Sequence, residues 1–163
     1  MRFNAGYSLQ QGDALETLDM GGGSTISLKV TGQQSHGLMT VLEGKVHEGG
    51  PPLHLHDAED EVVIVLDGEL DFQVGSERDR LTAGGILWLP RKIPHAVANL
   101  QEKPCRFITI ITPSGIEGFF REQRDYLATL PPHALPDPTV LNSITGAERR
   151  PVVGPPLTRP SPG

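Results

Sequence analysis

The sequence predicts a single all-β domain, a sandwich or barrel of about nine strands, followed by one helix. Three observations support this class. The length of 163 residues suits one domain. Short apolar stretches alternate with polar residues, and glycines separate these stretches between residues 6 and 85. Hydrophobic residues make up 37% of the chain and charged residues 21%, which is ordinary for a protein with a packed core.

Nine stretches have the length and pattern of strands, at spacings of roughly 8–12 residues. The stretch 61–66 is apolar on both faces, which predicts a strand buried between two layers. Asp67-Gly68 is typical of a tight hairpin, and the residues after it alternate between apolar and polar. The predicted strands are 24–31, 38–46, 52–56, 61–66, 69–74, 80–81, 86–89, 95–99 and 106–112.

The pattern changes after residue 113. Apolar side chains then recur at helical intervals, which predicts a short C-terminal helix that ends at Pro131-Pro132. From about residue 142 the chain has few apolar residues and many prolines, so we expect disorder there. The expected division is an N-terminal arm at 1–22, a barrel at 23–113, a helix at 114–130 and a Pro-rich extension at 131–163.

Charge and composition exclude several classes of protein. The net charge is −6 and no Lys/Arg cluster precedes the tail, so no nucleic-acid partner is expected. The chain has no apolar run long enough to span a membrane and no visible secretion signal, which predicts a cytoplasmic protein without a membrane partner. The single cysteine, Cys105, excludes an internal disulfide and a multi-cysteine zinc site.

The stretch PPLHLHDAEDEVVIVLDG contains candidate metal ligands. His54 and His56 project from the same face of a strand, at a separation that suits two imidazoles on one metal ion. The polar residues after His56 provide a turn, which lets Glu61 face the same interior from the next strand. Two imidazoles and a carboxylate are a common ligand set for divalent metals.

A third imidazole is expected from the stretch LPRKIPHAVAN, in which His95 ends a proline-bounded turn. The predicted metal ligands are then His54, His56, Glu61 and His95, and they leave open positions for a substrate. Glu59 and Asp60 compete with Glu61 for the role of the carboxylate. The spacing to Gly68 favours Glu61, and the other two are expected to be solvated turn residues.

These two stretches resemble the two signature motifs of the cupin superfamily. The first motif maps to His54, His56, Glu61 and Gly68, and the second to Gly84, Pro90, His95 and Asn99. Lys92 departs from the second motif, which has a glycine at that position; this puts the local turn geometry in question, because glycine permits a positive φ. Within the superfamily the chain looks most like small single-domain cupins of the quercetin-dioxygenase type, and also like polyketide-cyclase cupins.

The resemblance implies a cupin jelly-roll barrel, one divalent transition metal per chain (Fe, Mn, Ni, Cu or Zn) and a homodimer. The implied function is that of a metal-dependent dioxygenase acting on a small oxygenated organic substrate. Two alternatives stay open: an oxygen-independent cyclase, isomerase or lyase, and a non-catalytic small-molecule-binding protein. Glu61 is the expected general base, with His47 as a candidate proton relay. The predicted pocket wall consists of Val63, Val65, Phe72 and Val97, with Phe72 also suited to the core.

Overall fold

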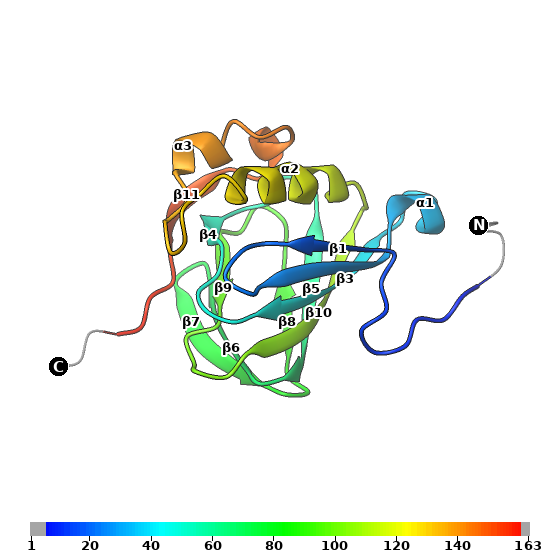
Figure 1. Cartoon of the computed structure of the whole chain (residues 1–163), viewed down its shortest axis with the longest axis horizontal. Helices are drawn as coiled ribbons and strands as arrows, with labels where there is room; N and C mark the ends of the chain where they lie inside the picture. The colour runs from blue at the N-terminus through cyan, green and yellow to red at the C-terminus, as the bar shows by residue number, and fades with distance from the viewer. Residues whose placement is uncertain (1–5, 161–163) are drawn as a thin grey trace.

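The computed structural model describes residues 6–160 and shows two antiparallel β-sheets that face each other across a common core (Figure 1). One sheet has the order β1 (Glu16–Asp19), β2 (Thr25–Val30), β3 (Thr40–Val46), β10 (Cys105–Thr112), β5 (Asp60–Asp67) and β8 (Ile86–Leu89). The other has the order β11 (Val152–Pro156), β4 (Pro52–His54), β9 (His95–Ala98), β6 (Glu69–Val74) and β7 (Glu77–Thr82). The chain crosses repeatedly between the sheets, and this arrangement is the predicted jelly roll.

The alternation of the strands places the core between the sheets. In β5 the side chains of Glu61, Val63 and Val65 point inward and are buried, whereas those of Val62 and Ile64 lie on the outer face. The largest cluster of buried side chains contains Val63, Val65, Leu70, Leu87, Leu89, Cys105 and Phe107. Cys105 is fully buried, and burial, together with Asp67 and Asp71, raises the pKa of its thiol to about 11.

Gly68 makes the tight turn between β5 and β6. Its φ is +78°, a conformation that suits glycine. A Cβ atom at this position would lie 2.6 Å from the carbonyl oxygen of Pro104. The turn therefore requires glycine both for its backbone conformation and for the close approach of the neighbouring chain.

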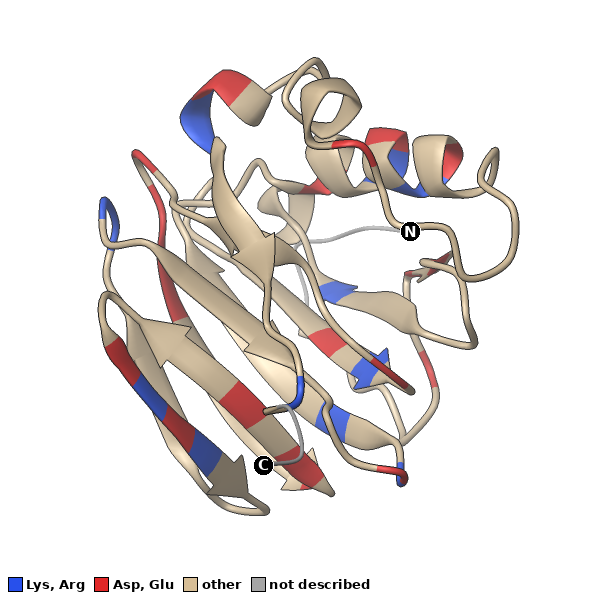
Figure 2. Ribbon diagram, turned by 90° about the vertical axis from the view of Figure 1, so that its left-hand side faces the viewer, with Lys and Arg blue, Asp and Glu red and all other residues tan. Residues whose placement is uncertain are grey.

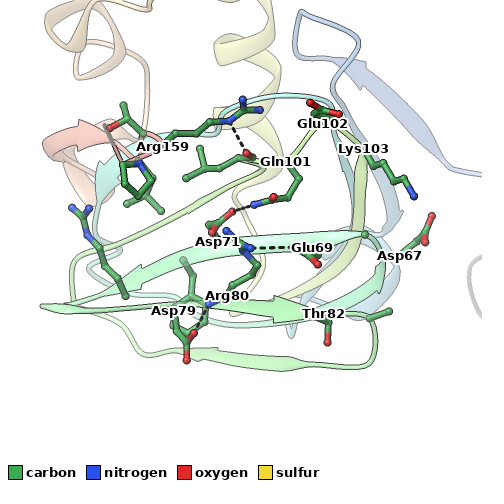
Figure 3. Close-up of a pocket in the computed structure, with 18 residues that line it drawn as sticks. Asp67, Glu69, Asp71, Asp79, Arg80, Thr82, Gln101, Glu102, Lys103 and Arg159 are labelled. Carbon is green, nitrogen blue, oxygen red and sulfur yellow. Dashed lines mark hydrogen bonds and ion pairs between the residues drawn. The ribbon is translucent and has the colours of Figure 1, made fainter. Parts of the chain in front are cut away.

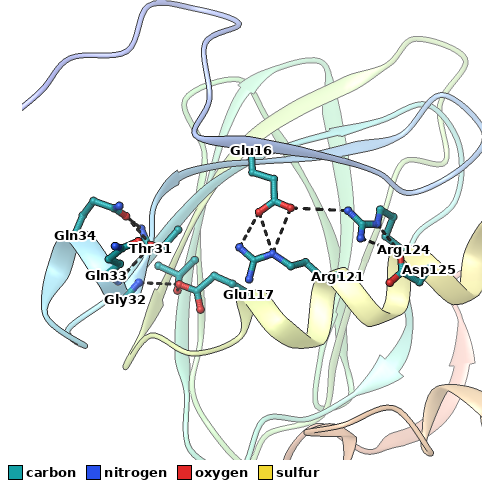
Figure 4. Close-up of polar contacts among 10 residues, drawn as sticks. Glu16, Thr31, Gly32, Gln33, Gln34, Glu117, Arg121, Arg124 and Asp125 are labelled. Atoms are coloured by element: carbon teal, nitrogen blue, oxygen red, sulfur yellow. Dashed lines mark hydrogen bonds and ion pairs between the residues drawn. The ribbon is translucent and has the colours of Figure 1, made fainter. Parts of the chain in front are cut away.

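Helix α2 (Glu117–Leu127) covers one edge of the barrel (Figure 1) and is shorter than the predicted 114–130. Its residues Phe119 and Phe120 pack against a second cluster that contains Leu28, Leu42, Ile111 and Ile116. The carboxylate of Glu117 is buried and accepts hydrogen bonds from the Gly32 and Gly115 amides and from the Thr40 hydroxyl. Farther along the helix, Arg121 forms an ion pair with Glu16 of β1 (Figure 4).

The C-terminal extension differs from the expectation of disorder from about residue 142. It contains α3 (Pro138–Leu141), a 3-10 turn at Ala147–Arg149, and β11. Three apolar residues, Leu141, Ile144 and Ala147, pack against Phe119 and Tyr126, and Leu157 covers Ala96 and Ala98 on the outer face of the second sheet. A few well-placed apolar side chains are therefore enough to order a proline-rich segment. Residues 161–163 lie outside the described residues.

The N-terminal arm also contributes to the sheet. Residues 16–19 form β1, which pairs with β2 from Glu16↔Leu28 to Asp19↔Thr25 and buries Leu18. The short α1 (Gly32–Ser35) begins at Thr31, whose side chain accepts a hydrogen bond from the Gln33 amide. The barrel thus extends beyond the predicted 23–113 at both ends.

Positions of both charge signs are interspersed along the strands and helices (Figure 2). Edge strand β7 begins with Glu77, Arg78, Asp79 and Arg80 in alternation, and such charges discourage pairing with the exposed edge of another sheet. Among residues 6–160, no helix has the length and apolar character needed to cross a membrane.

Candidate metal centre

The pairing of β4 with β9 brings two of the predicted ligands together. His54 is the register partner of His95, so both side chains project from the same face of the sheet. That face is the inner one, because Val97, two residues from His95, packs into the main core cluster. Ala96 and Ala98, on the opposite face, pack against Leu157 of the extension.

His56 follows β4 and completes a group of three imidazoles. One ring nitrogen from each of His54, His56 and His95 lies within 4.8 Å of the others. The ring centroids are 4.7 Å apart for His54 and His95, and 5.2 Å apart for each of the other two pairs. The structure thus brings together the three histidines that the sequence predicts.

The hydrogen bonds of the rings identify which nitrogen faces the centre. The Nδ1 atom of His54 lies 2.7 Å from the carbonyl oxygen of Pro52, and that of His95 lies 3.0 Å from the carbonyl oxygen of Ile93. A carbonyl oxygen only accepts, so each Nδ1 carries the hydrogen and each Nε2 of the neutral ring has a free lone pair. The Nε2 atom of His95 is buried and has no hydrogen-bond partner among the described residues. A divalent metal ion fits this unsatisfied donor set.

The environment of His54 and His95 keeps these two rings neutral. Burial lowers the pKa of His54 to about 3, and the neighbouring His95 and His56 rings add to this effect. Burial also lowers the pKa of His95, although the nearby Glu61 carboxylate opposes the shift. Neutral imidazoles are the form that binds a metal.

Glu61, the second residue of strand β5, faces the centre as predicted. Its Oε1 atom lies 3.3 Å from Nε2 of His56, and its side chain is 11% exposed. Within residues 6–160, no lysine or arginine forms an ion pair with this carboxylate. Glu61 can therefore act either as a fourth ligand or as a proton acceptor beside the three imidazoles.

The turn before β9 holds His56 in place. The Lys92 amide donates a hydrogen bond to the carbonyl oxygen of His56, at 2.6 Å. Lys92 has a φ of +66°, so the lysine adopts the left-handed conformation that glycine takes in the family motif. In the same turn Arg91 makes a two-pronged ion pair with Asp60, at 2.7 Å for its shortest contact. Asp60 thus serves the turn and does not compete with Glu61.

Glu59 is buried, and the expectation that it is a solvated turn residue is wrong. It is 4% exposed, and its carboxylate forms an ion pair with Arg150 of the C-terminal extension, which is 6% exposed. Its Oε2 atom lies 3.4 Å from Nδ1 of His56. Burial opposes ionisation, but the His56 ring and the Arg150 guanidinium together lower the pKa of Glu59. Sequence reasoning missed this contact because 91 residues separate its two charged partners.

His47 does not reach the centre, so its predicted role as a proton relay is wrong. Its ring packs over Gly23, where an added Cβ would lie 3.3 Å from it. Glu61 lies beside the Thr40 end of β3, since Ile111 pairs with both Glu61 and Thr40. His47 follows the opposite end of that strand, seven residues away or roughly 23 Å at about 3.3 Å per residue.

The predicted pocket residues belong to the core beside the centre. Val63 and Val65 are each 1% exposed, and Val97 and Phe72 pack against the same cluster. Phe72 also borders a groove on the outer side of the second sheet, where Figure 3 shows Asp71 and Arg80 among the lining residues. That groove has a volume of about 1350 Å³, and its lining includes the ion pair of Arg80 with Asp71 but none of the three histidines. The groove is therefore separate from the metal centre.

Comparisons with known proteins agree with this description of the fold. The cupin domain family matches residues 37–111. A KdgF structure from Halomonas sp. is 18% identical, with a TM-score of 0.58 over 68% of this chain and 96% of that one. A predicted oxalate decarboxylase from Thermotoga maritima is 18% identical, with a TM-score of 0.55 over 63% of this chain and 95% of that one.

An RmlC-like cupin from Shewanella frigidimarina is 20% identical, with a TM-score of 0.53 over 66% of this chain and 90% of that one. No curated protein matches the chain by sequence. At these identities the structural likeness concerns the fold alone, but the domain match covers the three histidines and Glu61. The motifs, the two-sheet jelly roll and the domain match together identify residues 37–111 of this chain as a cupin domain.

Proposed function

We propose that this protein is a metal-dependent enzyme that acts on a small oxygenated organic molecule. One observation carries the proposal: the imidazoles of His54, His56 and His95 direct their Nδ1 atoms toward oxygen acceptors, so that their Nε2 atoms face a shared centre. A divalent transition metal in this centre supplies positive charge and open positions that polarise substrate oxygens. Its identity, among Fe, Mn, Ni, Cu and Zn, depends on geometry and availability.

Each residue of the centre has a distinct task in this proposal. His54, His56 and His95 hold the metal, because one ring nitrogen of each lies within 4.8 Å of the others. Glu61 accepts the proton of a substrate hydroxyl, since its carboxylate faces the same centre and has no basic partner within residues 6–160. Val63 and Val97 form part of the apolar core behind the ligands.

The leading reaction is a dioxygenase reaction on an enol or phenol. The resemblance of the two motifs to cupins of the quercetin-dioxygenase type supports this choice. The runner-up is an oxygen-independent cyclisation, isomerisation or lyase step at the same centre. In that reaction Glu61 moves a proton between two substrate positions, and molecular oxygen takes no part.

Oxygen uptake with a panel of flavonols and related enols distinguishes these reactions. The protein is loaded with each of the five metals in turn and assayed in air and without oxygen. A dioxygenase consumes oxygen only in air, whereas the runner-up forms product under both conditions. Two variants serve as controls: His95→Ala removes a ligand, and Glu61→Gln removes the proton acceptor and should lower kcat by about 10²–10⁴-fold.

The contradicting result is equally clear. If the metal-loaded protein binds members of the panel but converts none of them in air or without oxygen, the chain is a binding protein and both enzymatic proposals are wrong.

A further inference from the structure

We infer that Glu59 and Arg150 are positioning residues for the metal ligand His56, and that the C-terminal extension is thereby part of the metal centre. The inference rests on the proposed metal binding, but it concerns residues outside the ligand set. It follows from the contacts of His56, from the burial of the Glu59–Arg150 pair, and from the backbone bonds that attach the extension to the ligand segment.

His56 differs from the other two histidines in the partner of its Nδ1 atom. His54 and His95 have backbone carbonyl partners, whereas His56 faces the carboxylate of Glu59 at 3.4 Å. The Nδ1 atom of His56 and the facing Oε2 atom of Glu59 are both buried and make no hydrogen bond to any other group in residues 6–160. A carboxylate partner orients an imidazole and makes it a stronger metal ligand.

Glu59 is itself fixed by a buried cation. Its other carboxylate oxygen, Oε1, contacts the guanidinium of Arg150, and both side chains are almost fully buried. A buried carboxylate without a partner would be costly, so Arg150 keeps Glu59 ionised and in place. The three groups form a continuous line from Arg150 through Glu59 to His56.

The position of Arg150 depends in turn on the extension and on α2. Its guanidinium lies over the Phe119 ring, 5.4 Å from the ring centroid, and donates to the carbonyl oxygen of Gly146 at 3.1 Å. The preceding 3-10 turn buries Ala147 against the cluster that contains Leu141 and Ile144. The cation therefore has a fixed position before any metal binds.

The backbone of the extension is also bonded to the ligand segment. The Asp57 amide donates to the carbonyl oxygen of Arg149 at 2.7 Å, and the Leu55 amide to that of Pro151 at 3.3 Å. Strand β11 then pairs with β4, with Val152 opposite His54. Residues 149–152 thus run alongside both His54 and His56. The ordered extension therefore helps to fix the backbone that carries these two ligands.

The test measures Co²⁺ binding to the full-length chain after a chelator has removed all metal. Glu59→Gln keeps the size of the side chain but removes its charge. We expect its Co²⁺ affinity to fall by about 10–100-fold, together with a changed visible Co²⁺ spectrum. Arg149→Met is the matched control, because Arg149 is exposed and contributes only its backbone carbonyl. Its affinity should stay within about two-fold of that of the wild type.

Arg150→Met alone leaves a buried carboxylate without its cation, and Glu59→Gln leaves the buried guanidinium facing a neutral amide, so both residues are also replaced together in the double variant Glu59→Gln/Arg150→Met. This variant has no unpaired charge. Because Arg150 acts on His56 through Glu59, the loss of Co²⁺ affinity in the double variant should be close to that of Glu59→Gln alone.

Three results would overturn the inference. If both variants bind Co²⁺ with wild-type affinity and spectrum while their metal-free unfolding temperature falls, the cluster stabilises the fold only. If the double variant binds Co²⁺ far more weakly than Glu59→Gln does, Arg150 does not act through Glu59 alone. If the wild type binds no Co²⁺, Zn²⁺ or Ni²⁺ at all, the proposed metal binding fails first and takes this inference with it.

Discussion

Lys92 replaces the glycine of the second cupin motif but keeps the backbone conformation that the glycine would take. The sequence left the turn geometry in question because lysine replaces the motif glycine, and the structure shows the lysine in the left-handed conformation. For an L-residue this conformation costs roughly 1–2 kcal/mol, and glycine avoids the cost. The strain is tolerated because the Lys92 amide holds the carbonyl of His56.

Lys92→Gly should therefore stabilise the protein. The relief of strain exceeds the extra chain entropy of glycine, about 0.5–1 kcal/mol, so the free energy of unfolding should rise by about 0.5–1 kcal/mol. Urea denaturation measures the change. Gly68→Ala should have the opposite effect and lower the free energy of unfolding, because the added Cβ would lie 2.6 Å from the carbonyl oxygen of Pro104. A loss of stability in Lys92→Gly would contradict this interpretation of the turn.

The histidines make the metal-free protein sensitive to acid. In the unfolded chain His54 has a pKa near 6.5, whereas in the folded chain burial and the neighbouring rings lower the pKa of His54 to about 3. Between these values the unfolded chain binds more protons, so the free energy of unfolding falls as the pH falls from 6.5 toward 3. The slope from one such imidazole is at most about 1.4 kcal/mol per pH unit.

Urea denaturation of the metal-free protein between pH 7.5 and about 5 tests this linkage. His54→Gln should flatten the dependence on pH. His133→Asn should leave it unchanged, because His133 is exposed and asparagine tolerates its positive φ of 65°. Equal slopes in the wild type and His54→Gln would show that the buried ring does not titrate as described.

At the scale of elements, the nine predicted strands all correspond to strands of the structure, because alternation and glycine turns are local signals. Strands β1 and β11 were not predicted. The four residues of β1 bury only Leu18 and so produce no periodic pattern. Strand β11 contains two prolines, which argue against a central strand but are tolerated at the edge position that it occupies.

The candidate site likewise contains residues that local sequence patterns predict and residues that they do not. His54, His56, Glu61 and His95 could be predicted because each lies within a short motif of fixed spacing. Glu59 and Arg150 could not, since no local pattern relates a turn residue to an arginine in a proline-rich tail. Contacts between distant segments depend on how the elements pack, and the sequence alone carries no signal for this one.

Glu117 makes a testable contribution to the packing of α2. Its carboxylate accepts from two backbone amides and the Thr40 hydroxyl in a buried position. Glu117→Ala leaves these donors unsatisfied and should lower the free energy of unfolding by about 2–4 kcal/mol. Glu16→Ala breaks only the partly exposed pairs with Arg121 and Arg124 (Figure 4) and should cost less than about 1 kcal/mol. Chemical denaturation of both variants measures the difference, and similar losses would contradict it.

For the whole molecule, the outer face of the six-stranded sheet is the strongest candidate for an interface. Its two apolar rows follow the strand register: Val41, Ile110, Val62 and Trp88 in one, and Ile108, Ile64 and Ile86 in the other. Ile86 is 65% exposed and Trp88 55%. An apolar sheet face with such exposed side chains is typical of an interaction surface. We propose that a second copy of the chain covers it, in a homodimer with two-fold symmetry.

Light scattering after size-exclusion chromatography tests the dimer. The wild type should have twice the 17.6 kDa mass of the chain, and the double variant Ile86→Glu/Trp88→Glu should have the mass of one chain. Leu135→Glu is the control, since Leu135 is 81% exposed and lies outside this face. A wild type with the mass of one chain, or a dimer that survives the double substitution, would contradict the proposal.

The central claim is that the three histidines bind one metal ion. The most direct measurement is a crystal structure of the Co²⁺-loaded protein, with anomalous data collected at the cobalt edge. The account predicts one strong anomalous peak per chain, about 2.0–2.2 Å from Nε2 of His54, His56 and His95. A peak held by other residues, or no peak while these rings keep their positions, would contradict it.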